Sequence, residues 1–532
     1  MLNKIKKFYN NMSIATKAAL WFVFCNIMQK GISTITVPLF TRLLTTAEYG
    51  TYSLYISWFN ILTIVTSLNL YYGVFNNALN RIRDKCERDK YVSSMQGLTI
   101  TLTIVLIIIY APFQDFWSNL LGLNKLVLWL MMAELLVEPA LQFWSARQRF
   151  EYRYKTMVSV TLLKSALNPV LGLILVIIAR DDKALARIVS VVAVEVVIAG
   201  SIMVLQFVRG KTLYSKDNWK YALGFNIPLI PHYLSGTILN QGDRIMIQNM
   251  VGESEVGIYS VAYSIGMLVQ LFTNAINNSL TPWMYENLNR KDYKNIRRNV
   301  NAILLFLGGV IVGLCFFVPE LVKIFGSEEY YSAIYVVPPV AASVYFIFLY
   351  NVFAIPQMYY EKQKFMSVAS IAAAILNIIL NAIFIPVFGF YAAGYTTVAS
   401  YIVYSTGHYW FSRKVCMEEI GSFELFDSKS ILLISIGVFG CSIAFIFLYR
   451  FGMVRYLMAI LLLIVAIGQY KRIGSCCLQW SNKHAEDLKV RKALELQDSE
   501  RIAVVIAAGY YLEETVIPCS VRKSVNDIYK EI

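Results

Sequence analysis

The chain has 532 residues, of which 57% are hydrophobic and only 15% are charged. This composition excludes a water-soluble globular protein, because too much apolar surface would remain to be buried, and it predicts an integral membrane protein. The formal net charge of +14 would suit a nucleic-acid-binding protein, but the basic residues lie mainly in the connections between apolar runs, as membrane topology requires, so we expect no nucleic-acid partner.

Fourteen apolar runs have the length of a membrane span. A bilayer core of about 30 Å needs about 20 apolar residues in a helix. The sequence therefore predicts an all-α polytopic membrane protein with about 14 transmembrane helices. The predicted spans are 18–40, 52–72, 95–111, 126–144, 157–179, 188–207, 221–242, 256–282, 300–318, 334–355, 366–388, 391–411, 431–449 and 453–470.

Lysine and arginine are distributed unevenly between the two sides of these spans. The amino-terminal segment and the even-numbered connections hold 27 of them, and the odd-numbered connections hold nine. Because positive residues favour the cytoplasmic side, both termini are predicted to be cytoplasmic, which an even number of spans allows. The first apolar run lacks a small-residue cleavage site, so we expect it to act as an uncleaved anchor.

A short pattern occurs twice, after the first span and at the end of the seventh. Residues 41–44 (Thr-Arg-Leu-Leu) precede residues 48–53 (Glu-Tyr-Gly-Thr-Tyr-Ser), and residues 243–246 (Asp-Arg-Ile-Met) precede residues 255–260 (Glu-Val-Gly-Ile-Tyr-Ser). The two Glu-x-Gly-x-Tyr-Ser elements are 207 residues apart, and further matches, such as Asn168 with Asn377, recur at an offset of 209. Internal repetition in an apolar chain is typical of transporters.

The repeat predicts four regions. Residues 1–208 and 209–412 hold six spans each and are predicted to form two six-helix lobes. Residues 413–470 hold two appended spans without a counterpart in the repeat. Residues 471–532 form a mixed-charge tail on the cytoplasmic side, to which the sequence assigns no function.

Ionisable residues within the spans are concentrated in the first half. In chain order they are Lys30 near mid-membrane, Glu134 and Glu138 one helical turn apart in the fourth span, Lys164 in the fifth and Glu195 in the sixth. Charge at this depth is costly, so each residue marks an ion pair or a functional contact. Glu138 shares its depth with Lys164, and Glu195 shares its depth with Lys30. The sequence leaves pairing and ligand contact open for both lysines.

The motif arginines lie at the outer boundary of the membrane, where a structural role is favoured. There Arg42 is expected to pair with Glu48, and Arg244 with Asp243 or Glu255. The glycine of each motif is expected to permit a tight turn.

A histidine lies between two prolines in the seventh span. His232 is either a proton carrier or a hydrogen-bonded packing residue, and the sequence does not decide between them. The candidates for coupling or ion pairing are Glu134, Glu138, Glu195, His232 and Asp243.

Signals for cofactors and for catalysis are missing from the sequence. The eight cysteines show no metal or redox spacing and are expected to be free thiols. There is no Gly-rich phosphate loop of the Walker type, so direct use of ATP is not expected. We expect no metal, no cofactor and no catalytic residue. The outward connections are too short to hold the active site of a membrane polymerase or ligase.

The motif residues 38–44 (Pro-Leu-Phe-Thr-Arg-Leu-Leu) and 48–50, with their counterparts at 243–244 and 257–260, carry a family resemblance. They resemble the Wzx-type oligosaccharide and polysaccharide flippases of the multidrug/oligosaccharidyl-lipid/polysaccharide exporter superfamily. The resemblance covers roughly residues 10–470 and departs from the family at Thr45-Thr46, where members commonly carry a proline before the glutamate. It implies two six-helix lobes around a central cavity, two extra helices, and export of undecaprenyl-diphosphate-linked oligosaccharide.

The implied substrate gives the cations a role. Cations at depth can pair with a diphosphate, so the candidate substrate contacts are Lys30, Lys164, Arg42 and Arg244. The implied reaction moves repeat units from the inner to the outer leaflet of a bacterial cytoplasmic membrane by alternating access. These units would serve O-antigen, capsule, exopolysaccharide or teichuronic-type polysaccharide synthesis.

The resemblance also implies the surroundings of the chain and leaves two rival functions. We expect a monomer among membrane lipids, with lipid-linked oligosaccharide as substrate and with a polysaccharide polymerase and chain-length machinery as partners. The alternatives are a flippase for a lipid II-type peptidoglycan precursor and a multidrug or cation antiporter of the same superfamily.

Overall fold

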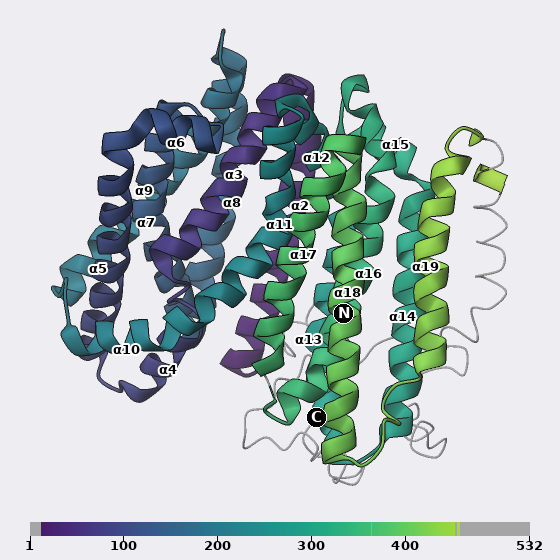
Figure 1. The fold of residues 1–532 in the computed structure, drawn as a ribbon. Helices are drawn as coiled ribbons and strands as arrows, with labels where there is room; N and C mark the ends of the chain where they lie inside the picture. The colour runs from purple at the N-terminus through teal and green to yellow at the C-terminus, as the bar shows by residue number, and fades with distance from the viewer. Residues whose placement is uncertain (1–11, 363, 453–454, 458–532) are drawn as a thin grey trace, which may run out of the picture.

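The computed structural model describes residues 12–362, 364–452 and 455–457. Every regular element in these residues is a helix, which confirms the predicted all-α membrane fold. In Figure 1, α5, α7 and α9 stand at the left, α14, α16, α18 and α19 at the right, and α2, α11, α12 and α17 between them.

The first half of the chain forms eight α-helices and one short 3-10 helix. They are α2 (Ile14–Leu43), α3 (Thr46–Ser67), α4 (Gly73–Arg81), α5 (Lys85–Tyr110), η1 (Ala111–Phe113), α6 (Gln114–Leu121), α7 (Lys125–Phe150), α8 (Tyr154–Ile178) and α9 (Lys183–Gly210).

The second half also consists of helices, up to the end of the described residues. Its elements are α10 (Lys216–Asn226), η2 (Ile227–Leu229), α11 (Ile230–Met250), α12 (Glu253–Gly266), η3 (Met267–Val269), α13 (Gln270–Asn289), α14 (Tyr293–Phe316), α15 (Val318–Phe325), η4 (Glu328–Tyr335), α16 (Val337–Tyr359), α17 (Lys364–Phe388), α18 (Tyr391–Glu419) and α19 (Ser428–Leu448).

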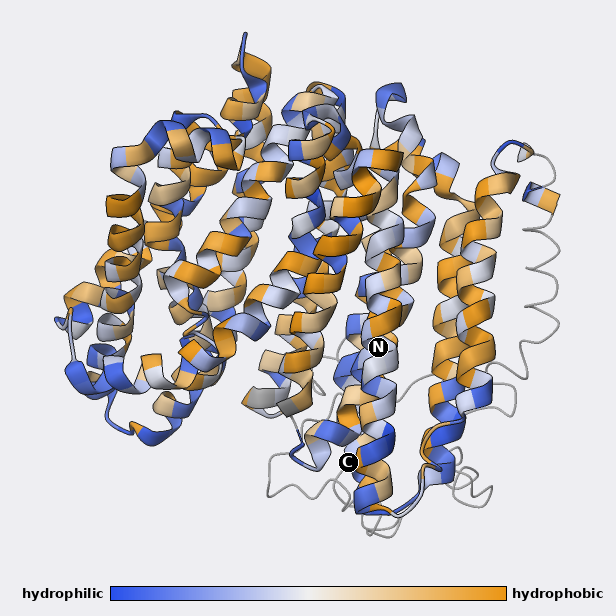
Figure 2. Cartoon of the chain, viewed as in Figure 1, coloured by the Kyte–Doolittle hydropathy of each residue, from blue (hydrophilic) through white to orange (hydrophobic). Residues whose placement is uncertain are grey.

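These helices coincide with the first thirteen predicted spans. Within the described residues, nine helices or continuous helix pairs are long and apolar enough to cross a membrane by composition alone. The other four predicted spans coincide with α2, α3, α11 and α18, which carry more polar residues. The fourteenth span, 453–470, lies outside the described residues except at 455–457. Figure 2 shows the apolar stretches along the middle of the helices and the polar residues gathered at their ends.

Short polar side chains fix where several helices begin. Thr45 caps α3 and forms a capping box with Glu48, so the backbone N–H groups of both residues are bonded. Asp84, Asn124 and Asp182 each accept a hydrogen bond from the backbone N–H three residues later and so cap α5, α7 and α9. The helix starts therefore follow local sequence chemistry.

In each half, one long helix packs against several others. In the first half, α9 packs against α5, α7 and α8; in the second half, α18 packs against α16 and α17. The halves meet mainly where α3 packs against α11 and α12. The division into lobes at 208/209 stays a prediction.

One helix of the second half lies against the first. The α10 helix packs on α4 and α5, where Trp219 Nε1 donates to the Ser94 carbonyl at 2.9 Å and Asn226 Nδ2 to the Leu68 carbonyl at 2.7 Å. The seventh predicted span is therefore broken, with Pro228 and Pro231 at the joint between α10 and α11.

Candidate functional site

Lys30 lies midway along α2 and is half-buried. Among the described residues, no hydrogen bond or ion pair joins its ammonium to another group. Of the two alternatives left open for Lys30, the pairing with Glu195 is not formed, because Glu195 pairs with Lys164. An ammonium without a protein partner at mid-membrane depth is available to an anionic ligand.

Lys164 and Glu195 form an ion pair between α8 and α9. The sequence pointed instead to Glu138 as the partner of Lys164, because those two residues share a depth, and this expectation is wrong. Glu195 is 2% exposed and Lys164 retains 30% exposure of its side chain. Lys164 is therefore already paired, so a ligand would have to compete with Glu195 for it.

The two glutamates of α7 take neutral partners. Glu134 accepts a hydrogen bond from the Tyr55 hydroxyl, and Glu138 Oε1 accepts one from Gln142 Nε2 at 2.7 Å. Both carboxylates are buried, and Glu138 Oε2 has no hydrogen bond within the described residues. With Glu195 they place three carboxylates and one lysine inside the first half.

Arg42 is exposed at the end of α2 and binds backbone carbonyls. It donates to Pro38 O at 3.3 Å and to Ile324 O at 3.1 Å, which ties α2 to α15. Glu48 does not pair with it, because its carboxylate caps Thr45. The expected Arg42–Glu48 pair is therefore wrong.

Arg244 is buried where α11 meets α12. Its guanidinium donates to Ser260 Oγ at 3.0 Å and to Gln241 Oε1 at 3.2 Å, and it lies 4.5 Å from the centroid of the Tyr263 ring. The expected salt bridges to Asp243 and Glu255 are not formed. Gln241 also accepts a hydrogen bond from Ser57 of α3, so Arg244 lies beside the contact between the halves.

Asp243 is completely buried and is held by neutral donors. Asn381 Nδ2 and Thr397 Oγ1 each donate to its carboxylate at 2.7 Å, and the Tyr259 hydroxyl donates as well. These donors come from α12, α17 and α18. The neutral donors compensate part of the desolvation of the carboxylate but leave its charge without a bonded cation.

His232 lies in the first turn of α11. Its Nδ1 and Ser370 Oγ of α17 are 2.9 Å apart, and the Tyr233 ring lies nearby. This contact fits the packing interpretation of His232. Proton transfer by His232 stays a prediction.

The motif glycines lie inside helices, so the expected tight turn is wrong. Gly50 of α3 and Gly257 of α12 face each other where the two helices cross. A Cβ added to Gly50 would lie 1.9 Å from Glu253 O, and one added to Gly257 would lie 2.1 Å from Thr46 O. Beside them, Thr46 Oγ1 and Ser254 Oγ form a 3.2 Å hydrogen bond.

This crossing gives the repeated pattern its physical meaning. Each copy supplies one glycine, and the absence of two side chains lets the helix backbones touch. Because the connections after the first and seventh spans are predicted to lie outside, the repeated motifs join the two halves at their outer ends.

Sequence analysis missed one buried cation, Arg187 of α9. The predicted span begins at residue 188, which places Arg187 in an outward connection, whereas α9 begins at Lys183. Arg187 is 4% exposed and is enclosed by α2, α3 and α8. The available signal in the sequence was Asp182, a helix-capping residue type five positions before Arg187.

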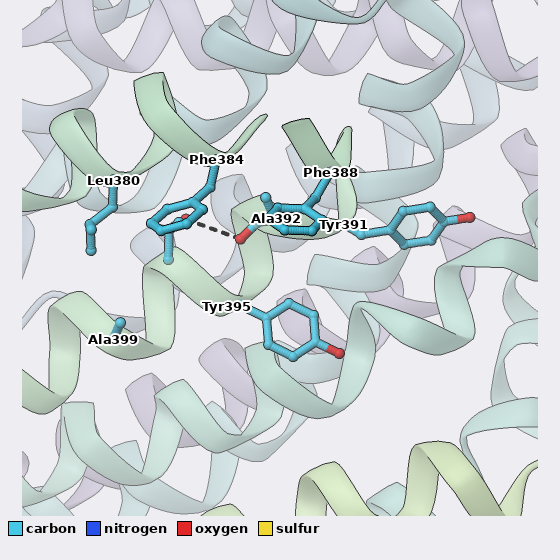
Figure 3. A pocket seen from close by; sticks show the side chains of 8 residues that line it. Leu380, Phe384, Phe388, Tyr391, Ala392, Tyr395 and Ala399 are labelled. Atoms are coloured by element: carbon cyan, nitrogen blue, oxygen red, sulfur yellow. Dashed lines mark hydrogen bonds between the residues drawn. The ribbon is translucent and has the colours of Figure 1, made fainter. Parts of the chain in front are cut away.

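An apolar pocket of about 510 Å³ lies between α17 and α18. In Figure 3 the rings of Phe384, Phe388, Tyr391 and Tyr395 surround it. Thr396 also lines the pocket, and its hydroxyl donates to Ala392 O at 3.2 Å. The lining carries no charge, so this pocket does not suit a phosphate group.

The described part of the chain contains no group of three or more His, Cys, Asp or Glu that could hold a metal ion. Its five cysteines are all free thiols, as expected for those positions.

Comparison with known proteins adds two family matches. A model of the polysaccharide biosynthesis protein family matches residues 15–288, which is more than half of the chain, and the MatE model matches residues 228–383. The chain is 30% identical over 165 residues to Lsg locus putative protein 1 of Haemophilus influenzae, an alignment that spans 40% of that relative. It is 22% identical over 406 residues to the probable low-salt glycan biosynthesis flippase Agl15 of Haloferax volcanii, of which 83% is covered.

Solved structures show the same fold. The inward closed conformation of the lipid II flippase MurJ superposes with a TM-score of 0.62 at 15% identity, covering 87% of this chain and all of that one. The inward-facing conformation of a multidrug resistance MATE family transporter of the MOP superfamily gives 0.56 at 14% identity, covering 72% and 94%. With the family match over residues 15–288, the chain is a multi-pass membrane protein that belongs to the polysaccharide biosynthesis protein family.

Proposed function

We propose that the protein is a flippase that moves a diphosphate-linked oligosaccharide lipid from the inner to the outer leaflet of a bacterial cytoplasmic membrane. The observation that carries the proposal is Lys30, a half-buried ammonium midway along a membrane-spanning helix, with no partner among the described residues. One relative, Agl15, is named as a probable low-salt glycan biosynthesis flippase, which supports the proposal.

The energetics of the membrane favour a ligand at Lys30. A charged side chain at the bilayer centre costs at least about 2.5 kcal/mol, so it is retained where it serves a function. Moving the negative charge of a diphosphate into hydrocarbon without a partner is also costly. Contact between the two groups reduces both costs. Arg244, whose bonded partners are neutral, is the second cation that we assign to this path.

The contacts between the halves support alternating access. The hydrogen bonds of Thr41 and Arg42 to α15, and of Thr46 to Ser254, join the halves at the predicted outer side. A substrate entering from the cytoplasm would leave only after these contacts break. The proposed cycle therefore moves the two halves apart at the Gly50–Gly257 crossing.

We assign ion coupling to Asp243. Its carboxylate is fully buried and is bonded only to neutral donors from three helices, so binding or release of a proton or a monovalent cation would change the charge of that cluster. The cluster belongs to α11, which also contacts α3. An ion at Asp243 can thus act on the contact between the halves.

Replacement of Lys30 by glutamine tests the proposal. A charge-assisted hydrogen bond contributes about 1.5–3 kcal/mol, so Lys30→Gln should lower glycan export about tenfold or more at equal protein level. Surface glycan is quantified by immunoblot in a strain that depends on this chain. Lys155→Gln, which removes an exposed cation at the start of α8, is the matched control. Unchanged export in Lys30→Gln would refute the role of Lys30.

Asp243→Asn tests the coupling. The amide keeps the size of the side chain but removes its charge, so transport into inverted vesicles should lose its dependence on pH and on sodium. The rate at the optimum should fall at least about tenfold, the effect of about 1.4 kcal/mol. Asp427→Asn, at the cap of α19, is the control. A variant with the wild-type ion dependence would remove Asp243 from the mechanism.

The same vesicles separate the two alternatives. Transport of a peptidoglycan precursor in preference to oligosaccharide lipid would favour the first alternative. Expression that confers drug resistance, without dependence on Lys30, would favour the antiporter.

A further inference from the structure

Arg187 is a buried cation that the proposed function does not use. Its Nη1 donates to Asn168 Oδ1 at 2.8 Å and to Ser190 Oγ at 2.9 Å, and its Nη2 donates to the Tyr52 hydroxyl at 3.4 Å. The guanidinium carbon lies 4.3 Å from the centroid of the Phe40 ring and 5.0 Å from that of Tyr52. Only 4% of the residue is exposed.

These partners leave the charge of Arg187 uncompensated. No carboxylate in the described residues forms a salt bridge with it, and its Nε has no hydrogen bond there. A buried charge is normally paired, because burial removes its hydration and a partner of opposite charge compensates for that loss. An anion would compensate this charge, and the guanidinium matches phosphate geometry well.

The internal repeat matches Arg187 and Thr41 of the first half with residues of different charge in the second half. The offset of 209 that matches Asn168 with Asn377 also matches Arg187 with Thr396. The residues that precede the motif arginines are Thr41 in the first half and Asp243 in the second. Thus the cation Arg187 corresponds to Thr396, and Thr41 corresponds to the carboxylate Asp243.

The hydrogen bonds of the second-half site support the match. Thr396 donates to Asn381, which donates to Asp243 at 2.7 Å, so the carboxylate is the centre of that cluster. In the first half the carboxylate is absent and Thr41 donates to Phe325 O instead. A cluster with a buried cation at its centre is complementary to an anion.

We propose that Arg187 is the centre of an anion site in the first half, which takes a phosphate group of the translocated lipid when the outer ends of α3 and α12 separate. The proposal rests on the proposed function for the source of that phosphate. Tyr52, which covers the guanidinium, lies two residues after Gly50 of the outer crossing. Tyr52 also packs against the core that includes Val256 and Tyr259 of α12, so separation of α3 from α12 would expose this ring and free it to turn away from Arg187 on the release side.

The experiment is calorimetric titration of inorganic pyrophosphate into the purified full-length protein carrying Lys30→Gln, so that Lys30 does not contribute. Adding Arg187→Gln should weaken binding at least tenfold, and Arg187→Lys should weaken it less, because the charge is kept. Lys155→Gln should leave binding unchanged. Chloride at equal ionic strength should give no comparable heat.

A second measurement tests access. The hydroxyls of Thr46 and Ser254 are 3.2 Å apart. In the double variant Thr46→Cys/Ser254→Cys, the two thiols should form a disulfide that holds the outer ends together. Pyrophosphate binding should be lost in the oxidised protein and return with dithiothreitol, while the parent protein treated in the same way keeps binding.

The proposal is overturned by equal binding in Arg187→Gln, or by chloride binding as tightly as pyrophosphate. If Arg187→Gln does not fold, binding that neither Arg187→Lys nor the disulfide changes overturns it. Export by the Lys30→Gln protein is scored separately, so failure of the Arg187 site and failure of the proposed function give different results.

Discussion

Lys164 pairs with Glu195, although Glu138 lies within the same bundle. Depth in the membrane can be counted along a sequence, because each helical residue rises 1.5 Å, but depth does not say which helices are neighbours. In the structure α8 packs closely on α9, which carries Glu195, and this contact selects the partner. The expected pairs of Arg42 and Arg244 fail for a related reason, because nearness along the chain does not determine which side chains meet.

Removing Glu195 should destabilise the protein. Glu195→Gln leaves the Lys164 ammonium without its counter-charge in a largely buried site, and breaking such a pair costs about 3–5 kcal/mol. Since 30% of the Lys164 side chain is exposed, we expect about 3 kcal/mol, seen as a lower melting temperature in detergent. Glu87→Gln, which breaks the exposed pair with Lys90, should leave the melting temperature unchanged. Equal melting of both variants would contradict the ion pair.

At the scale of elements, the crossing of α3 and α12 depends on the absence of two side chains. Each motif glycine places its Cα against a backbone carbonyl of the other helix. The pattern Glu-x-Gly-x-Tyr-Ser was recognisable in the sequence as a repeat, but its two copies were not recognisable as mutual partners. Glycine allows both a turn and a close helix contact, so the residue type alone could not decide.

A methyl group at this crossing should force the helices apart. Gly50→Ala places a Cβ 1.9 Å from Glu253 O, where the backbone cannot yield easily, and overpacking of this kind costs about 1–3 kcal/mol. Gly309→Ala in α14 is the control, because nothing lies within 4 Å of its added Cβ. Thermal unfolding compares the two variants. A Gly50→Ala protein as stable as Gly309→Ala would show that the helices do not touch as described.

For the whole molecule, the contacts between the two halves lie at the helix ends that are predicted to face outward. The two halves are joined there by α3 with α12 and by the carbonyl contacts of Arg42 to α15. Helix α10 gives a further link, because it packs beneath the first half while its chain continues into α11 of the second. The proline joint between α10 and α11 is therefore placed where the halves would move relative to each other.

Joining the outer ends should stop transport. In the variant with cysteines at Thr46 and Ser254, oxidation should abolish glycan export and dithiothreitol should restore most of it, because the release side can no longer open. Pulse-labelled surface glycan measures the effect. Each single cysteine variant controls for the native thiols. Export that continues with the ends covalently joined would exclude alternating access at this crossing.

The sequence by itself determined the helices, their order, their duplication and the charge bias of their connections. These features depend on local composition, because a span needs only enough consecutive apolar residues and a cap needs only its own side chain. The four helices with more polar sequences were still recognisable as spans for that reason.

Only the tertiary structure decided the partners of the buried charges. Among the described residues Lys30 has no bonded partner, Arg187 is enclosed, and Asp243 accepts hydrogen bonds from three helices, because these properties depend on which helix faces meet. Neighbours in space come from residues up to more than a hundred positions apart, and no local pattern encodes that choice. The candidate site therefore follows from helix packing, whereas the membrane fold follows from the order of apolar and polar residues.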